Sequence, residues 1–352
     1  MPLQEYLKET AKKVDAEMEK LFPKKLGAKW MEFALGKPDF EYDVQTATDA
    51  ASKPIWNFLE RGGKRWRPAL MLLCCEAVGG DSGKHISFTV LPELAHNGTI
   101  MVDDVEDNSK LRRGKPCTHI LFGQDIAIND GNLMYYLPTI ILYRNTNKLP
   151  AEKIARIYNV YAEEMNRLSF GQATDIHWHN GHRNDITERQ YLQMCSYKTG
   201  SLSRLSANIG AILGDATPEQ REKLARFASM LGVAFQIQDD IMNISPPEGW
   251  GKEVGDDINE GKRTLLVIHT LENAEKHDAK RLIEILDSHT EDEEEIKEAI
   301  AIIKKYGSIG YAKAKASSLV KEAWADLNPA LEESGAKARL KEFADYVIER
   351  KI

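Results

Sequence analysis

Two short acidic segments contain the residues of this chain that are best suited to bind a metal ion. Asp103 and Asp107 lie four positions apart in the first segment, and Asp239 and Asn243 lie four positions apart in the second. On a helix, this spacing places both side chains on one face, about one turn apart. Buried carboxylates repel one another unless a cation lies between them, and oxygen-only ligands favour Mg²⁺. The two segments therefore predict a helical enzyme that holds a diphosphate through magnesium.

Basic residues lie on both sides of the first acidic segment in the sequence. Arg112 and Arg113 follow it, and their guanidinium groups match the geometry of phosphate oxygens. Lys64 and Arg67, three positions apart after the glycine pair at 62–63, can bind a second anionic group. Taken alone, the acids and arginines could form a surface salt-bridge patch, and the basic stretch could simply be solvated. Their combination favours phosphate binding.

The second acidic segment is also followed by cations. Lys252 and Lys262 come after it in the sequence. A diphosphate leaving group needs Mg²⁺ on one side and ammonium groups on the other to absorb the charge that it develops. Between the two acidic segments, Asp175, Lys198 and Thr199 supply a further carboxylate, a cation and a hydroxyl group.

The composition argues against several classes of protein. A net charge of -7 argues against a general nucleic-acid binder, which normally carries a basic surplus. The four cysteines include no C-x-x-C pair, so we expect a reduced, cytoplasmic protein. No apolar stretch approaches the roughly 20 residues of a membrane helix, and the first residues lead into a charged helix and not into an apolar signal segment.

The elements that position these residues are predicted to be helices. Apolar residues recur at the helical period over 152–169, 219–231 and 336–348, and no alternation long enough for a core sheet occurs. Glycine and proline residues interrupt the pattern where helices should end. We expect an all-α fold, in which residues 1–352 form a single domain of many helices around a deep central cavity. Residues 1–50 could form peripheral N-terminal helices.

The order and spacing of these elements resemble the trans-type isoprenyl diphosphate synthases, the polyprenyl synthetase family. The similarity extends from about residue 56 to residue 347. Residues 103–114, together with the pairs Ile128-Asn129 and Tyr135-Tyr136, are most similar to the geranylgeranyl diphosphate synthases of the eukaryotic type. The resemblance implies the isoprenoid synthase type of helical fold and a homodimer.

The resemblance also implies a Mg²⁺-dependent prenyltransferase. Such an enzyme condenses isopentenyl diphosphate with dimethylallyl, geranyl or farnesyl diphosphate and releases pyrophosphate, and in the subgroup named above the product is geranylgeranyl diphosphate. One alternative, a class I terpene cyclase, needs no second diphosphate site, which Lys64, Arg67 and Arg113 indicate here. A second alternative, a non-catalytic partner subunit, should have lost an acidic segment, whereas only Asn243 departs from the family pattern.

The resemblance assigns three Mg²⁺ ions to the acidic residues. Asp103 and Asp107 match the first aspartate-rich motif of the family and would bind two ions that hold the allylic diphosphate. Asp239 begins the second motif and would bind the third ion. The second motif usually ends in aspartate, and Asn243 stands there in this chain, which implies a weaker contact through a metal-bound water.

The remaining assignments divide the polar residues between the two substrates. The predicted catalytic residues are Lys198, Thr199, Gln236 and Lys252. The predicted substrate-binding residues are Lys64, Arg67, His96, Arg112, Arg113 and Lys262. By resemblance, the allylic diphosphate would contact Arg112, Lys198 and Lys252. The isopentenyl diphosphate would contact Lys64, Arg67, His96 and Arg113. Thr199 and Gln236 would lie beside the allylic carbon on which positive charge develops.

The product length is predicted from two small residues one helical turn before the first acidic segment. Gly98 and Thr99 stand where, in this family, large aromatic residues stop growth at fifteen carbons. We therefore expect a longer product, with twenty carbons favoured, and a farnesyl or a C25 or longer product as alternatives. Gly98 could instead serve only to let two helices approach closely. A deeper barrier could come from Met134, Tyr135 or Tyr136.

Two further features are explained by local structure. His177, His179 and His182 could be read as a metal site, but a solvated turn is favoured, because family members carry a loop at this position. Thr290 and Glu293 have the spacing of a capping box, which predicts that a helix begins at this point.

Overall fold

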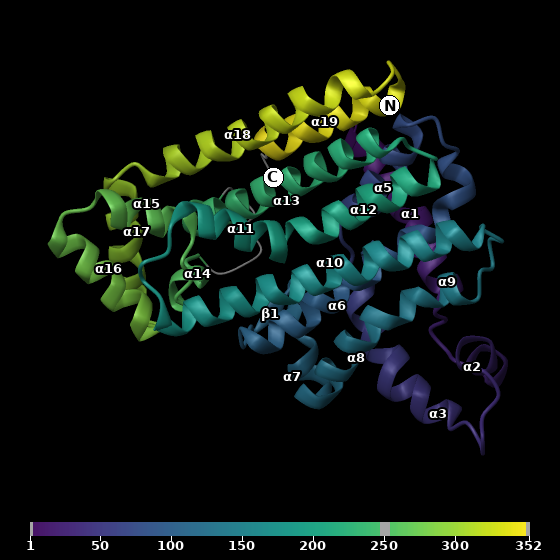
Figure 1. The fold of residues 1–352 in the computed structure, drawn as a ribbon. Helices are drawn as coiled ribbons and strands as arrows, with labels where there is room; N and C mark the ends of the chain where they lie inside the picture. The colour runs from purple at the N-terminus through teal and green to yellow at the C-terminus, as the bar shows by residue number, and fades with distance from the viewer. Residues whose placement is uncertain (1–2, 247–253, 350–352) are drawn as a thin grey trace. The chain divides into compact units, whose positions relative to one another are not determined.

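The computed structural model of the protein describes residues 3–246 and 254–349 (Figure 1). Within these residues nearly all regular structure is helical, and the only strands are a short antiparallel pair, Leu111–Arg112 (β1) and Lys115–Pro116 (β2). The all-α class predicted from the sequence is confirmed. None of the described helices is both long enough and apolar enough to cross a membrane.

The chain folds into two compact units. The described parts of Met1–Val160 and Ser206–Ala216 form the first unit, and those of Tyr161–Leu205 and Thr217–Ile352 form the second. Two long helices, Ala151–His177 (α10) and Gly200–Leu213 (α12), contribute residues to both units. The single domain predicted over residues 1–352 stays a prediction.

The first unit consists of helices joined by short connections. Besides its parts of α10 and α12, its helical segments are Leu3–Leu21 (α1), Ala28–Leu35 (α2), Val44–Ala47 (α3), Thr48–Ser52 (η1), Lys53–Leu59 (α4), Trp66–Ala77 (α5), Ser82–Thr89 (η2), Val90–Glu106 (α6), Thr118–Phe122 (α7), Gln124–Tyr136 (α8), Leu137–Thr139 (η3) and Ile140–Tyr143 (α9). Almost every side chain of α5 is buried, so this helix forms the centre of the unit.

The N-terminal helix α1 is amphipathic and is packed onto this centre. Leu7, Val14 and Met18 lie at helical spacing and are buried, as expected for one apolar face. The helix packs against α5, α6 and η2. One face of α1 therefore belongs to the core of the first unit, and the peripheral N-terminal helices stay a prediction.

The second unit is built around one long helix. Besides its parts of α10 and α12, its helical segments are Trp178–His182 (η4), Glu188–Lys198 (α11), Pro218–Ile244 (α13), Asp256–Asn259 (α14), Leu265–Asn273 (α15), Lys276–Ser288 (α16), Glu293–Lys305 (α17), Ser308–Leu327 (α18), Asn328–Ala330 (η5) and Gly335–Glu349 (α19). Helix α13 packs along α18, and α18 lies beside α19, as Figure 1 also shows.

The three helices predicted from the apolar period are confirmed as parts of α10, α13 and α19. The start of α13 has strong local signals, because Pro218 occupies its first turn and Thr217 forms a capping box with Gln220. The capping box predicted at Thr290 and Glu293 is wrong. Asp292 caps α17 instead, since its carboxylate accepts a hydrogen bond from the Glu294 amide at 2.8 Å. The Thr290 hydroxyl accepts from the amide of that cap.

Candidate functional site

The first acidic segment lies at the C-terminal end of α6. The Asp107 amide donates a hydrogen bond to the Asp103 carbonyl at 2.8 Å, so the two residues are one helical turn apart, as the spacing predicts. Both side chains are partly exposed, whereas Asp104 between them is only 1% exposed. The segment therefore presents two carboxylates on its accessible face and turns a third one inward.

Arg112 holds the inward carboxylate of this segment. Its Nε and Nη2 atoms lie 2.7 and 2.5 Å from Oδ1 of Asp104, and Nη2 lies 4.0 Å from the Asp103 carboxylate. Burial raises the pKa of Asp104, and the arginine opposes that shift. Burial also disfavours the charged Arg112, but Asp104 outweighs it and raises the pKa of the guanidinium group. The turn after α6 is thereby tied to the acidic segment, with Arg112 beside Asp103.

A second ion-pair network fixes the basic loop before α5. Arg65 adopts a left-handed backbone with φ of 46° and is almost fully buried. Its guanidinium group binds Asp15 of α1 at 2.9 Å and Glu93 of α6 at 2.8 Å. With Arg65 turned inward, the neighbouring Lys64 is exposed to solvent. The anchoring role of Arg65 was not predicted from the sequence, although its place between two predicted phosphate ligands, Lys64 and Arg67, was a signal for a separate role.

Three of the predicted isopentenyl diphosphate ligands gather around this loop. Arg67 Nη1 lies 3.1 Å from His96 Nε2. Arg113 donates hydrogen bonds to the Gly62 carbonyl and, at 3.3 Å, to the Asn97 side chain. Burial and the charge of Arg67 lower the pKa of His96 well below its ordinary value, so this imidazole is neutral. Burial and nearby arginines lower the pKa of Arg113 to about 10.

The residues predicted to set product length lie where α6 crosses α8. A Cβ atom added to Gly98 would lie 2.7 Å from the Gly131 carbonyl oxygen and 2.9 Å from the Met134 Cβ atom, well inside contact distance. This observation supports the packing alternative for Gly98. Thr99 is partly buried, and its hydroxyl donates to the His96 carbonyl. Of the deeper residues, Met134 is buried and Tyr136 is 71% exposed.

In the second unit, the predicted catalytic residues Lys198 and Thr199 lie at a break between two helices. Lys198 ends α11, Thr199 is its C-terminal cap and Gly200 begins α12. Cβ atoms added at Gly171 of α10 or at Gly232 of α13 would collide with the backbone of this break. Gly171, Gly200 and Gly232 therefore allow α10, α12 and α13 to pack closely at this break. The close packing fixes the positions of Lys198 and Thr199.

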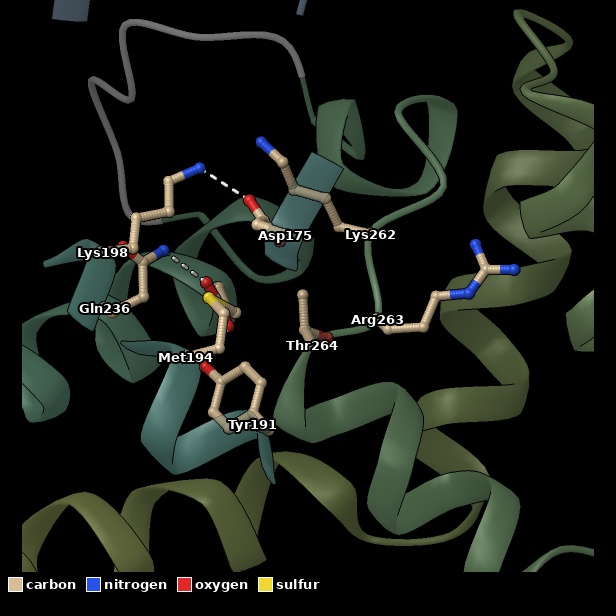
Figure 2. A pocket seen from close by; sticks show the side chains of 9 residues that line it. Asp175, Tyr191, Met194, Lys198, Gln236, Lys262, Arg263 and Thr264 are labelled. Atoms are coloured by element: carbon tan, nitrogen blue, oxygen red, sulfur yellow. Dashed lines mark hydrogen bonds and ion pairs between the residues drawn. The ribbon is translucent and has the colours of Figure 1, made fainter. Parts of the chain in front are cut away.

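The second unit contains a pocket at this break (Figure 2). Its lining residues are Asp175, Tyr191, Met194, Lys198, Gln236, Asp240, Lys262, Arg263 and Thr264. Lys198 Nζ lies 2.6 Å from the Asp175 carboxylate. Burial opposes ionisation of Asp175, but Lys198 and Lys262 outweigh it and hold its pKa below the ordinary value. Figure 2 shows both lysines extending toward Asp175, so this side of the pocket has two ammonium groups around one carboxylate.

Lys262 is held by acidic neighbours on its own loop. Its ammonium group pairs with Glu260 and lies 3.8 Å from Asp257. The adjacent Arg263 is buried and pairs with Asp287 of α16 and with Asn184, at 2.8 Å. Arg263 thus anchors the loop while Lys262 extends into the pocket, as Figure 2 shows.

The second acidic segment divides its two aspartates in the same way as the first. Asp239 is partly exposed, whereas Asp240 is only 4% exposed. The Tyr191 hydroxyl donates to Asp240 Oδ2 at 2.6 Å, and Gln236 Nε2 donates to Asp240 Oδ1 at 2.9 Å. Burial raises the pKa of Asp240 to about 6. The Thr199 hydroxyl donates to Gln236 Oε1 at 2.8 Å, so both predicted residues for the allylic carbon are in contact.

The departure at Asn243 has a structural role in this unit. Asn243 is buried, and its Oδ1 atom accepts a hydrogen bond from the Asp257 amide at 3.3 Å. Its carbonyl accepts from the Gly255 amide at 3.0 Å. Asn243 therefore anchors the start of α14, which leads into the Lys262 loop. The predicted catalytic residue Lys252 lies outside the described residues.

The histidine-rich segment is not the fully solvated turn that the sequence favoured. His177 ends α10, and Gly181 breaks the following segment with φ of 77°. Trp178 and His179 are buried, however, with 7% and 8% exposure. The apolar indole explains the difference, because it is buried on the protein side of the turn.

The acidic residues fit magnesium in the chemistry of their donors. Asp103, Asp107 and Asp239 offer hard carboxylate oxygens from partly exposed side chains. Across residues 3–246 and 254–349, no group of three or more His, Cys, Asp or Glu side chains is close enough to hold a metal ion by itself. Mg²⁺ commonly takes only one or two carboxylates and fills its other positions with water and phosphate oxygens. The donor set therefore suits an ion that is shared with a phosphorylated ligand.

Comparison with known proteins places the chain among prenyl-chain synthases. Residues 48–303 match the family model described as polyprenyl synthetase. A short chain isoprenyl diphosphate synthase from Methanothermobacter thermautotrophicus is 38% identical over 84% of this chain and 88% of its own length. A geranylfarnesyl diphosphate synthase from Aeropyrum pernix is 32% identical over 86% of this chain and 95% of its own length.

A solved structure gives the same result for the fold. The crystal structure of a geranylgeranyl pyrophosphate synthetase from Pyrococcus horikoshii matches with a TM-score of 0.85 and 34% identity. The match covers 99% of this chain and 98% of that protein. The similarity therefore extends over both units and is not limited to the motifs.

Proposed function

The chain belongs to the polyprenyl synthetase family, and from this premise we propose that it condenses isopentenyl diphosphate with allylic diphosphates to form geranylgeranyl diphosphate. The observation that carries the proposal is the division of the cations into two sets. Arg67 and Arg113 gather around one loop of the first unit, beside the neutral His96. Lys198 and Lys262 line a pocket of the second unit. A reaction between two diphosphates needs both sets, whereas cyclisation of one diphosphate does not.

The acidic residues are proposed to hold three Mg²⁺ ions, two on Asp103 and Asp107 and one on Asp239. The support is their exposure, their oxygen donors and the helical-turn spacing of the first pair. When bound, the ions would neutralise the charge of the departing pyrophosphate. Asp104 and Asp240 are buried behind these ligands and are assigned no ion.

The lysines of the second unit are proposed to bind the allylic diphosphate as it leaves. Lys198 and Lys262 are each held by a carboxylate, Asp175 and Glu260. Each ammonium group would exchange its carboxylate partner for phosphate oxygens of the substrate. Negative charge develops on these oxygens as the diphosphate leaves. The oxygen atoms of Thr199 and Gln236 would stabilise the positive charge on the allylic carbon.

The basic loop of the first unit is proposed to orient the second substrate. Lys64, Arg67 and Arg113 would bind the diphosphate of isopentenyl diphosphate, and the neutral His96 could donate one further hydrogen bond. Holding the double bond in position lets it attack the allylic cation without a large entropic cost. A proton then leaves the new chain, with pyrophosphate as the acceptor. Water must be excluded, because it would convert the cation to an alcohol.

A twenty-carbon product is proposed, and a C25 product is the alternative. The Pyrococcus protein is a geranylgeranyl synthetase and the Aeropyrum protein a geranylfarnesyl synthase. The small side chain of Thr99 supports a product longer than fifteen carbons. Gly98 has a different role, because it allows α6 and α8 to pack closely. Thr99→Phe should shorten the product, and an unchanged length would show that this side chain does not face the growing chain.

Two further proposals concern the state of the enzyme. A homodimer is proposed from the family resemblance, and sedimentation at several concentrations tests it. A cytoplasmic location is proposed from the cysteines, which are Cys74, Cys75, Cys117 and Cys195 and lie buried as free thiols.

The reaction is tested with purified protein, Mg²⁺, labelled isopentenyl diphosphate and each allylic diphosphate in turn. After dephosphorylation, chromatography gives the length of the products. We expect linear alcohols, with geranylgeraniol dominant. Cyclic hydrocarbons without linear products would indicate a terpene cyclase. Absence of any turnover with all starters would indicate a non-catalytic subunit, in which Asn243 marks a degenerated motif.

A further inference from the structure

A continuous chain of hydrogen bonds runs through the second acidic segment and ends at Thr199. The Tyr191 hydroxyl donates to Asp240 at 2.6 Å, Gln236 donates to the other oxygen of Asp240 at 2.9 Å, and Thr199 donates to Gln236 at 2.8 Å. Tyr191 and Asp240 are buried, and Gln236 and Asp240 lie one helical turn apart on α13. Tyr191 begins this chain on α11, and Figure 2 shows it reaching into the pocket.

The chemistry of the groups fixes the direction of every bond in this chain. Gln236 Nε2 donates to Asp240 Oδ1, so the NH₂ group of the Gln236 amide faces the carboxylate. Its carbonyl oxygen then faces Thr199, and the Thr199 hydroxyl must donate to it. The lone pairs of the Thr199 oxygen are thereby left on the side away from Gln236. Without the bond to Gln236, the Thr199 hydroxyl would rotate freely and would turn either its proton or its lone pairs to that side.

Tyr191 fixes the orientation of the Asp240 carboxylate, which is the first acceptor in this chain of hydrogen bonds. Gln236 is bound to only one oxygen of Asp240, and the hydroxyl of Tyr191 is bound to the other, so the carboxylate cannot rotate without losing a contact. Burial keeps the tyrosine protonated, because it raises the pKa of the phenol well above the ordinary value. A phenol in this state is a permanent donor.

We infer that Tyr191 is a positioning residue, which acts through Asp240 and Gln236 to turn the lone pairs of the Thr199 hydroxyl toward the developing allylic cation. The inference rests on the proposed prenyl transfer and adds a residue that the sequence did not indicate. Tyr191 itself would touch neither substrate. Its removal should slow the formation of the cation while leaving the affinity for both diphosphates unchanged.

The test is a double-mutant cycle between Tyr191→Phe and Thr199→Val, with steady-state kinetics on farnesyl and isopentenyl diphosphates. We expect Tyr191→Phe to lower kcat about tenfold, with both KM values within about twofold of wild type. Thr199→Val should lower kcat further, and Thr199→Ser should restore most of the loss. The double variant should be no slower than Thr199→Val alone, because the tyrosine has nothing left to orient.

The matched control is Tyr306→Phe. Its hydroxyl also donates to a carboxylate, Asp278, at 2.7 Å, but none of the pocket residues takes part. This variant should keep the kinetics of the wild type. Circular dichroism shows whether Tyr191→Phe folds. If it does not, Asp240→Asn takes its place in the cycle, because asparagine has the volume of aspartate and replaces the carboxylate by an amide.

The outcomes separate this inference from the function on which it rests. Additive effects in the cycle, or a loss confined to KM, would overturn the positioning role while wild-type turnover upheld the prenyltransferase. Wild-type protein without prenyl transfer would overturn both. Coupled losses in kcat that the serine variant rescues would support both.

Discussion

Each of the two acidic segments contains one buried carboxylate, and the two carboxylates are stabilised by different kinds of partner. Asp104 and Asp240 each follow the proposed metal ligand of their segment, and both are almost fully buried. Asp104 is held by a cation, Arg112, whereas Asp240 is held by two neutral donors, Tyr191 and Gln236. The cation cancels the charge of its partner, and neutral donors only stabilise it. Identical spacing in the sequence thus gives an ion pair in one unit and a directed hydrogen-bond chain in the other.

A third buried carboxylate extends this comparison. Asp130 on α8 accepts one hydrogen bond, from the side chain of Asn129 at 3.1 Å. Among the described residues its Oδ2 atom has no hydrogen-bond partner. Burial raises the pKa of Asp130 to about 7, compared with about 6 for Asp240. The fewer the donors around a buried carboxylate, the more its neutral form is favoured.

The largest expected effect comes from the exposed members of the two segments. Asp103→Ala should lower kcat by roughly 1,000-fold, because it removes a ligand of two proposed ions that stabilise the leaving group. Asp239→Ala, which affects one proposed ion, should be less severe. Turnover assays over a range of Mg²⁺ concentrations measure both. The exposed Asp125 on α8 offers a control, Asp125→Ala. Near-normal activity of Asp103→Ala would refute the assignment.

The next effect concerns the partners of the inward carboxylates. Arg112→Gln leaves the charge of Asp104 buried without a cation and should lower the free energy of unfolding by about 3 kcal/mol. Tyr191→Phe removes one neutral donor from Asp240 and should cost about 1 kcal/mol. Urea titrations give both values. Equal losses would show that the charge of the partner does not matter, contrary to the comparison.

An effect on stability that depends on pH is expected for Asp130. Its folded-state pKa of about 7 exceeds that of the unfolded chain, near 4, so the folded protein binds this proton more tightly. Stability should therefore fall as the pH rises from about 4 to about 7. Asp130→Asn removes this loss and should raise the free energy of unfolding at pH 8 by up to about 4 kcal/mol. The variant and wild type should converge at about pH 4, and parallel curves across this range would contradict the shifted pKa.

The smallest effect is expected at Asn243. Aspartate can accept the Asp257 amide as asparagine does, and it adds one charge to the second segment. Asn243→Asp should leave kcat unchanged or raise it by no more than about threefold. A fall of tenfold or more in the assay described above would show that the neutral amide is required.

The features that could be predicted from the sequence are those that depend on neighbouring residues, and the features that could not are mostly contacts between distant residues. The turn joining Asp103 and Asp107 was predictable, because helical period is a local property. The Tyr191–Asp240 contact joins residues 49 positions apart, and Arg65–Glu93 joins residues 28 apart. Periodicity contains no information on which distant partner a side chain selects. The cap at Asp292 shows the same limit at short range, where two candidate oxygens compete for neighbouring amides.

The glycines around the helix break limit how this protein can be altered. A single methyl group on Gly171 or Gly232 would push directly on the backbone that carries Lys198 and Thr199. In a randomised library these two codons should therefore return almost unchanged among active clones. Engineering toward other chain lengths is better aimed at side chains around Thr99, since changes there leave this three-helix junction intact.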